Sequence, residues 1–186
     1  MKQLLVLLTL IIFCSSIHAQ EKLYVKERNT LQYLVSVQTQ SFPMFFYIDS
    51  FNNNNLTLTW SFEDGRTGKF ITTKASLYSA TYGYYTRPND GEELVLPGTQ
   101  SLLFFSKSVF AALQKNGKAV FDEALLTVKP STKQNAFKLS GKIIDALYTE
   151  SESGAKIWVL NNPDSPVILK IENNPVGVNV ELTGIN

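Results

Sequence analysis

The sequence predicts an all-β fold, either a curved antiparallel sheet or an open or closed barrel, with one short helix. Two segments, 56–62 and 176–182, alternate apolar with polar residues, as half-buried antiparallel strands do. Asparagine, aspartate, glycine and proline separate these and several other short apolar runs, which is typical of hairpins and meanders. Only one segment carries apolar residues at helical spacing, so the sheet is expected to form most of the core.

Five strands are expected in the first half of the chain. In 56–62, leucine, tryptophan and phenylalanine share one face, while threonine and serine occupy the other. The turn 63–66 contains glycine, and 69–73 is expected to return beside 56–62 as a hairpin. Pro43 has no N–H to donate and is expected to mark the edge of a strand. The three strands expected upstream are 24–28, 31–37 and 44–49.

The one expected helix covers 107–115. Ser106 can cap its first turn, and Asn116-Gly117 supplies a stop after its last turn. A helix of this length suits a plug or lid over one end of a sheet. Its apolar stripe consists of Val109, Phe110 and Leu113.

The C-terminal third is expected to be a meander of antiparallel strands. Two turns, at 161–164 and 173–175, contain asparagine and proline. Before the meander, 119–129 and 136–149 are expected to form longer strands, the second bent at Gly141. The strands that the two turns separate are 156–160, 167–171 and 176–182.

The N-terminal residues have the layout of a secretory signal peptide. A basic residue, Lys2, precedes an apolar run over 4–13, and small residues lead to Ala19. The run is about ten residues long, whereas a helix that spans a bilayer needs about twenty. We therefore expect cleavage after Ala19, export to the periplasm or beyond the cell, no transmembrane span, and one β-rich domain over 20–186.

N-terminal sequencing of the exported protein is expected to begin at Gln20. Two alternatives to cleavage after Ala19 are a buried N-terminal helix and a lipoprotein anchor at Cys14. Lipid attachment favours a small residue just before the cysteine, and here that residue is Phe13. Recovery of a lipid-modified Cys14 as the first residue would contradict the prediction.

The only cysteine and the only histidine, Cys14 and His18, lie within the predicted signal peptide. Its removal leaves no thiol and no imidazole, which excludes Cys or Ser–His nucleophilic catalysis, Cys/His zinc sites, His- or Cys-ligated haem and disulfides.

Removal of the signal peptide also leaves 16 basic and 16 acidic residues, because Lys2 is removed with it. No stretch is strongly basic, so neither nucleic acid nor a membrane surface is an expected partner. No catalytic residue, metal site or cofactor is predicted.

The stretch 78–97 is the least regular part of the sequence and holds the candidate ligand-binding residues. Long irregular segments with several turn residues are either functional or mobile. Aromatic side chains here can stack on a sugar ring or line an apolar site; the alternative is that they pin the loop onto the sheet. The candidates are Tyr78, Tyr82, Tyr84 and Tyr85. Trp60 and Trp158 lie within predicted strands and are expected in the core.

Paired carboxylates are the enzymatic option that remains, since two acids flanking a glycosidic bond suffice for its hydrolysis. The adjacent pairs 63–64 and 122–123 are expected to point in different directions, which argues against such a role. Asp145 lies between apolar neighbours, and the alternative is that it faces water on the polar side of its strand. Residues 90–93 offer oxygen ligands but lack the spaced acids of a calcium loop, so a plain exposed turn is expected.

The C-terminal segment 157–184 has a distinctive pattern. A tryptophan strand leads through Asn161-Asn162-Pro163 to a Pro-Val strand, and then to a Val-Gly strand that ends near Glu181-Leu182-Thr183. This pattern resembles the tail of a family of exported bacterial proteins, similar to those of the Bacteroidota, that is known only as a domain of unknown function. The resemblance implies a curved antiparallel sheet or open barrel in the cell envelope, and it carries over no catalytic residue.

Three functions remain open on these grounds. The first is a non-enzymatic envelope protein that binds a small apolar or amphipathic ligand or an envelope partner, because a strongly curved sheet encloses an apolar groove. The second is a structural or adaptor protein that acts through a sheet edge or an apolar surface patch. The third is a carboxylate-dependent glycan hydrolase. The space inside the curved sheet distinguishes the first function from the others. If Phe, Tyr and Trp side chains fill that space, a ligand-binding function loses its basis.

Overall fold

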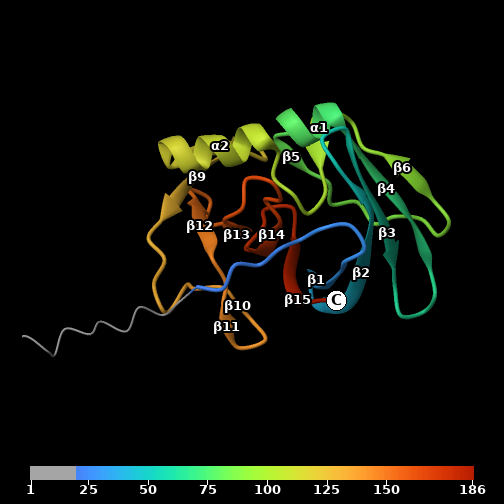
Figure 1. Ribbon diagram of the computed structural model, residues 1–186. Coiled ribbons are helices and arrows are strands. Elements are labelled where there is room, and N and C mark those ends of the chain that lie inside the picture. The colour runs from blue at the N-terminus through green and yellow to red at the C-terminus, as the bar shows by residue number, and fades with distance from the viewer. Residues whose placement is uncertain (1–19) are drawn as a thin grey trace, which may run out of the picture.

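The computed structural model describes residues 20–186, so the expected signal peptide 1–19 lies outside the described range. These residues form an 11-stranded sheet with the order β6-β4-β3-β2-β1-β15-β14-β13-β12-β9-β8 (Figure 1). All neighbours pair antiparallel except β4 and β6, which run parallel. The predicted all-β antiparallel fold is confirmed, and the sheet is open rather than closed into a barrel.

The described elements have the following bounds. The strands are β1 (Thr30–Val37), β2 (Gln40–Phe51), β3 (Asn55–Ser61), β4 (Thr67–Thr73), β5 (Tyr82–Gly83), β6 (Glu93–Val95), β7 (Gln100–Ser101), β8 (Lys118–Phe121), β9 (Ala124–Lys129), β10 (Lys138–Leu139), β11 (Lys142–Ile143), β12 (Ala146–Ser151), β13 (Lys156–Leu160), β14 (Ile168–Glu172) and β15 (Val178–Ile185). The helices are α1 (Lys74–Ser79) and α2 (Lys107–Asn116). Neither helix is long and apolar enough to cross a membrane.

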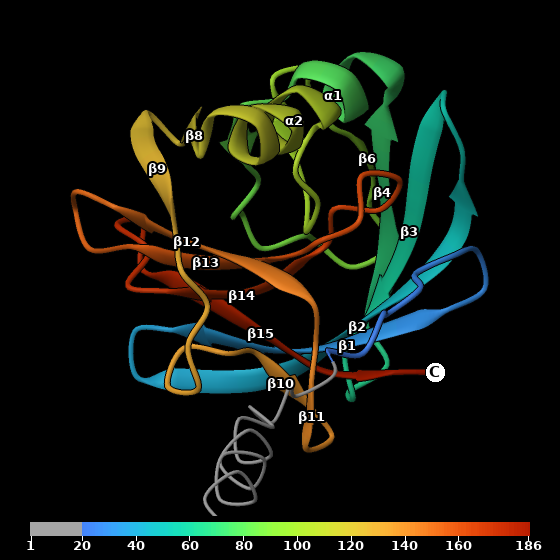
Figure 2. The same ribbon diagram turned by 60° about the vertical axis from the view of Figure 1, so that its left-hand side comes forward.

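The sheet bends strongly between its two halves. Figure 2 shows β2, β3 and β4 rising on one side, β12, β13 and β14 crossing below, and α1 and α2 lying over the open side. Register shifts in β1, β2 and β13 interrupt the ladders, and such bulges increase local twist and bending. The concave face therefore becomes a trough that the helices and the segment between them cover.

Large side chains from the concave face fill most of this trough. Trp60 packs on Phe62 and Phe70, with ring centroids 5.5 Å and 6.5 Å apart. Tyr33 of β1 is 1% exposed, and its hydroxyl donates to the Ile168 carbonyl of β14 at 2.6 Å. Burial raises the pKa of Tyr33, so the phenol stays protonated and keeps this bond. The bond joins β1 to β14 over the strand between them, β15.

Three groups of predicted elements are confirmed. The strands 56–62 and 69–73 correspond to β3 and β4, which form the expected antiparallel hairpin. The predicted helix is α2, whose N-cap Ser106 accepts a hydrogen bond from the Val109 amide; Gly117 follows with a left-handed φ of 67°. The meander is also confirmed, because β12, β13, β14 and β15 are consecutive neighbours in the sheet.

The N-terminal half differs from the prediction in three places. Residues 24–28 form no strand. Pro43 lies inside β2 opposite Leu34 rather than at a strand end. This is possible because β3 begins to pair with β2 only at Phe45, so the missing N–H of proline breaks no second ladder. Helix α1 was not predicted, because its six residues are too few to show a helical period.

Both long strands predicted in the middle of the chain are wrong. The segment 119–129 is the hairpin of β8 and β9, and its turn residues Asp122 and Glu123 have φ values of 50° and 63°. The turn contains no glycine, which is the usual sequence signal for a hairpin turn. Its positive φ values are possible because aspartate tolerates the left-handed region. The segment 136–149 is divided into the small hairpin of β10 and β11, which turns at Gly141, and the strand β12.

Both tryptophans are buried, as predicted, at 1% exposure for Trp60 and 7% for Trp158. Trp158 is opposite Tyr148 and Lys170 in the ladders of β13, on the face that points away from the trough. Its ring lies 4.8 Å from the Tyr148 ring, and its Nε1 donates to the Asn135 carbonyl at 2.6 Å. A second, smaller packing cluster therefore lies on the convex side of the sheet.

Candidate functional site

The irregular segment predicted to carry function crosses the trough. We call residues 82–88 the strap. Its first two residues form β5, which pairs with β7, and the Tyr84 amide donates to the Ser101 carbonyl at 2.9 Å. Just after the strap, Asp90 accepts a hydrogen bond from the Thr67 amide of β4 at 3.0 Å. The strap thus leads from β7 to the β4 side of the sheet, over the concave face.

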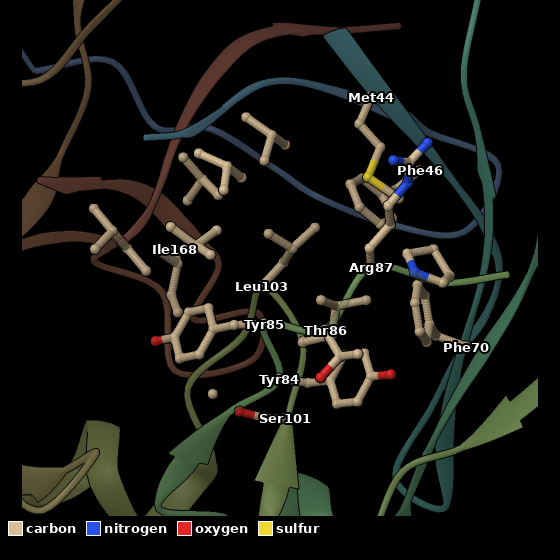
Figure 3. A pocket seen from close by; sticks show the side chains of 18 of the residues that line it. Met44, Phe46, Phe70, Tyr84, Tyr85, Thr86, Arg87, Ser101, Leu103 and Ile168 are labelled. Atoms are coloured by element: carbon tan, nitrogen blue, oxygen red, sulfur yellow. The ribbon is translucent and has the colours of Figure 1, made fainter. Parts of the chain in front are cut away.

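An apolar cavity of about 100 Å³ lies between the strap and the sheet. Figure 3 shows Tyr84, Tyr85 and Arg87 of the strap on its wall, with Met44 and Phe46 of β2 nearby. None of the residues that line it is aspartate or glutamate. The sheet residues that line it include Val35, Met44, Phe46, Ile168, Ile171 and Val180.

One polar side chain in the cavity wall has no partner. Ser101 is 3% exposed, and its Oγ makes no hydrogen bond with the described residues. A buried hydroxyl without a partner costs about 1–3 kcal/mol, and native structures contain few such groups. The hydroxyl is enclosed by neighbouring atoms, so it is a buried polar group beside the cavity rather than one that the cavity exposes.

Arg87 extends the strap to the cavity mouth. It lines both the cavity and the open cleft beside it, and its guanidinium carbon lies 6.0 Å from the centre of the Phe62 ring. Arg66 lies over the same ring at 4.8 Å but is ion-paired with Asp64 at 2.7 Å. Hydrogen bonds from Arg66 lower the pKa of Asp64, so this pair stays charged. The cleft at the mouth therefore carries two cations and two carboxylates, Glu63 and Asp64, of which Arg66 and Asp64 are paired with each other.

Asp122 anchors the start of the strap. Its two carboxylate oxygens accept from the Gly83 amide at 2.8 Å and from the Tyr85 hydroxyl at 2.6 Å, while its own amide donates to the Thr81 carbonyl at 2.8 Å. Burial, and then the charge of Asp122, raise the pKa of Tyr85, so the phenol keeps its proton for this bond. The turn of the β8–β9 hairpin thus fixes the strap over the trough.

The structure separates the four candidate tyrosines into two pairs. Tyr84 and Tyr85 line the cavity, and the Tyr84 ring packs on Phe70 with centroids 5.5 Å apart. Tyr78 is 41% exposed on α1, where the Lys107 ammonium lies 4.7 Å from its ring centre. Tyr82 is 39% exposed and donates to Glu123 at 3.2 Å. Only Tyr84 and Tyr85 therefore belong to the candidate site.

The other residues singled out from the sequence lie elsewhere. Asp145 is outside the strands and accepts a hydrogen bond from Asn161 at 3.1 Å. The 90–93 turn is tied by bonds of Asp90 to Thr67 and of Glu92 to Asn89. Within residues 20–186, no three acidic side chains gather in a way that would hold a metal ion. The acidic side chains of Asp90, Glu92 and Asp145 therefore bond to nearby polar groups and do not form a common site.

Arg87 and Ser101 were missed by the sequence reasoning. Arg87 lies in the irregular stretch 78–97, but nothing in its neighbours shows that it faces a cavity. Ser101 is an ordinary serine in a two-residue strand, and its burial depends on the whole trough.

No protein-family model, curated protein or solved structure matches this chain. The resemblance of 157–184 to exported proteins of unknown function therefore stays a prediction. The fold and the site define the class of protein: an open, strongly bent antiparallel sheet with a small apolar cavity beneath a strap. Such a site can bind and orient a small molecule.

Proposed function

We propose that this protein is a non-enzymatic exported protein of the cell envelope that binds a small apolar or amphipathic molecule beneath the strap. The observation that carries the proposal is the apolar cavity between the strap and the sheet. An empty apolar cavity forfeits dispersion contacts with its lining. A small apolar molecule that fills it restores these contacts.

The volume limits the size of the molecule. An engineered apolar cavity of about 150 Å³ binds benzene. The present cavity of about 100 Å³ therefore suits one small ring or a short chain, with any polar end at the mouth. Phe, Tyr and Trp side chains occupy much of the remaining trough, so this cavity does not extend to the length of a lipid tail.

The composition of the cavity favours binding over catalysis. Glycoside hydrolysis needs two carboxyl groups that face the same bond, and none of the residues lining the cavity is acidic. Ser101 has no histidine or other base beside it that would activate it as a nucleophile. The hydrolase alternative thus gains no support from this site.

Filling the cavity tests the proposal. Val180 is 8% exposed on β15 and lines the cavity, so Val180→Phe places a ring in the binding space. We expect calorimetric titration with hexan-1-ol to show binding to the wild type and at least a tenfold loss in the variant. Val120→Phe makes the same change at a valine that is 54% exposed on β8, and it should bind like the wild type.

Two results would contradict the proposal: no binding of hexan-1-ol to the wild type, or equal binding to a folded Val180→Phe variant. Overpacking a core position can cost about 1–3 kcal/mol, so a thermal melt must accompany the titration. If Val180→Phe does not fold, Val178→Phe takes its place, because Val178 lines the same cavity and is only half-buried.

A further inference from the structure

We propose that the molecule held beneath the strap is a small monoanion, a carboxylate on a short apolar body, and that Arg87 binds its charged end. This inference rests on the proposed function and adds the chemical class of the ligand. Its basis is the position of one unpaired cation at the mouth of an otherwise apolar cavity.

Arg87 is placed to reach a ligand that projects from the cavity. It belongs to the strap itself, and it lines both the cavity and the adjoining cleft. Figure 3 shows the side chain extending from the strap toward Met44 and Phe46, well apart from Ser101. A molecule with its apolar body against these walls would present its outer end to the guanidinium.

The charge of Arg87 is free for such a partner. No carboxylate of the described residues lies within 4.0 Å of its guanidinium, whereas Arg66 beside it is held by Asp64 through bonds of 2.7, 2.9 and 3.1 Å. Asp64 is thereby committed to Arg66, although its field reaches Arg87. Glu63 lines the same cleft, so the mouth has no net charge, and the selection for an anion comes from the free N–H donors of Arg87 itself.

The chemistry of guanidinium favours a carboxylate in particular. Its planar fork of N–H donors matches the two carboxylate oxygens, and such charge-assisted pairs are stronger than neutral hydrogen bonds. The Phe62 ring, 6.0 Å from the guanidinium carbon, offers a face that favours this placement of the cation.

Three probes of equal chain length test the assignment by calorimetric titration: hexanoate, hexan-1-ol and hexylammonium. We expect the wild type to bind hexanoate at least tenfold more tightly than hexan-1-ol, and hexylammonium most weakly. Arg87→Gln should remove the preference for hexanoate, so that hexanoate and hexan-1-ol bind with similar affinities. Lys118→Gln, on the exposed edge strand β8, makes the same change in net charge and should keep the preference.

The outcomes separate this inference from the proposed function. Equal affinities of the wild type for all three probes would overturn the anion class, while binding in the cavity would stand. A preference for hexanoate that survives Arg87→Gln would overturn the role of Arg87. If no probe binds the wild type, both proposals fall. Arg87 is exposed, so its substitution is expected to leave the melting temperature unchanged and the titrations comparable.

Discussion

Replacing Trp158 with alanine is expected to lower the free energy of unfolding by about 3–5 kcal/mol, the usual cost of truncating a buried tryptophan. The side chain is 7% exposed, stacks on Tyr148 at 4.8 Å, and donates from Nε1 to the Asn135 carbonyl at 2.6 Å. The Lys170 ammonium also lies 5.6 Å from its ring centre. The loss would be a large share of the roughly 5–15 kcal/mol that holds a domain folded.

Urea unfolding measures this loss, with Tyr24→Ala as the control. Tyr24 is also a large aromatic residue, but it is 70% exposed, so its truncation should barely move the midpoint. Since Trp158 lies on the face away from the cavity, Trp158→Ala should not change the affinity for hexan-1-ol while the protein remains folded. An unfolding midpoint equal to that of the wild type would show that the ring is not buried in solution.

The cluster around Trp158 also shows where sequence patterns stop being informative. The short apolar run 156–160, followed by a polar turn, correctly predicts that β13 is a strand and that its tryptophan is buried. It does not show that burial occurs on the convex side, because the covering segment near Asn135 comes from elsewhere in the chain. Both faces of β13 are buried, so an alternating polar face is absent there.

Local signals predicted the local elements well. The cap at Ser106 and the glycine at 117 define α2 because both act within a few residues of the helix ends. The pairing of β1 with β15 has no such signal, since Leu31 and Ile185 are at opposite ends of the described chain. The bend of the sheet depends on that pairing, and with it the trough.

In the candidate site, too, some residues have a local sequence signal and others depend on contacts between distant parts of the chain. The aromatic residues of an irregular stretch are visible in the sequence, but that pattern singled out Tyr78 and Tyr82, which lie outside the cavity, equally with Tyr84 and Tyr85, which line it. Arg87 and Ser101 come to line the cavity only because the strap lies over the sheet. A free charge at an apolar mouth and an unpartnered hydroxyl are properties of tertiary structure, so no single-sequence pattern reports them.

Replacing Asp122 with alanine is expected to destabilise the protein by about 3 kcal/mol, the lower end of what two hydrogen bonds to a charged group contribute. The variant leaves the Gly83 amide and the Tyr85 hydroxyl without their acceptor. Asp122 also has a left-handed φ of 50°, which aspartate tolerates better than alanine. Glu123→Ala is a matched control, because Glu123 has a φ of 63° and a single, exposed bond to Tyr82.

The local consequence distinguishes loss of the anchor from general destabilisation. If Asp122 holds the strap, hydrogen exchange of the Gly83 amide should accelerate far more in Asp122→Ala than exchange in the β3–β4 hairpin. Asp122→Asn should fall between the wild type and the alanine variant, since an amide oxygen can still accept from Gly83 but carries no charge. Equal exchange of Gly83 in Asp122→Ala and Glu123→Ala would show that the strap is held by its packing on the sheet, with Tyr85 seated by burial rather than by the carboxylate.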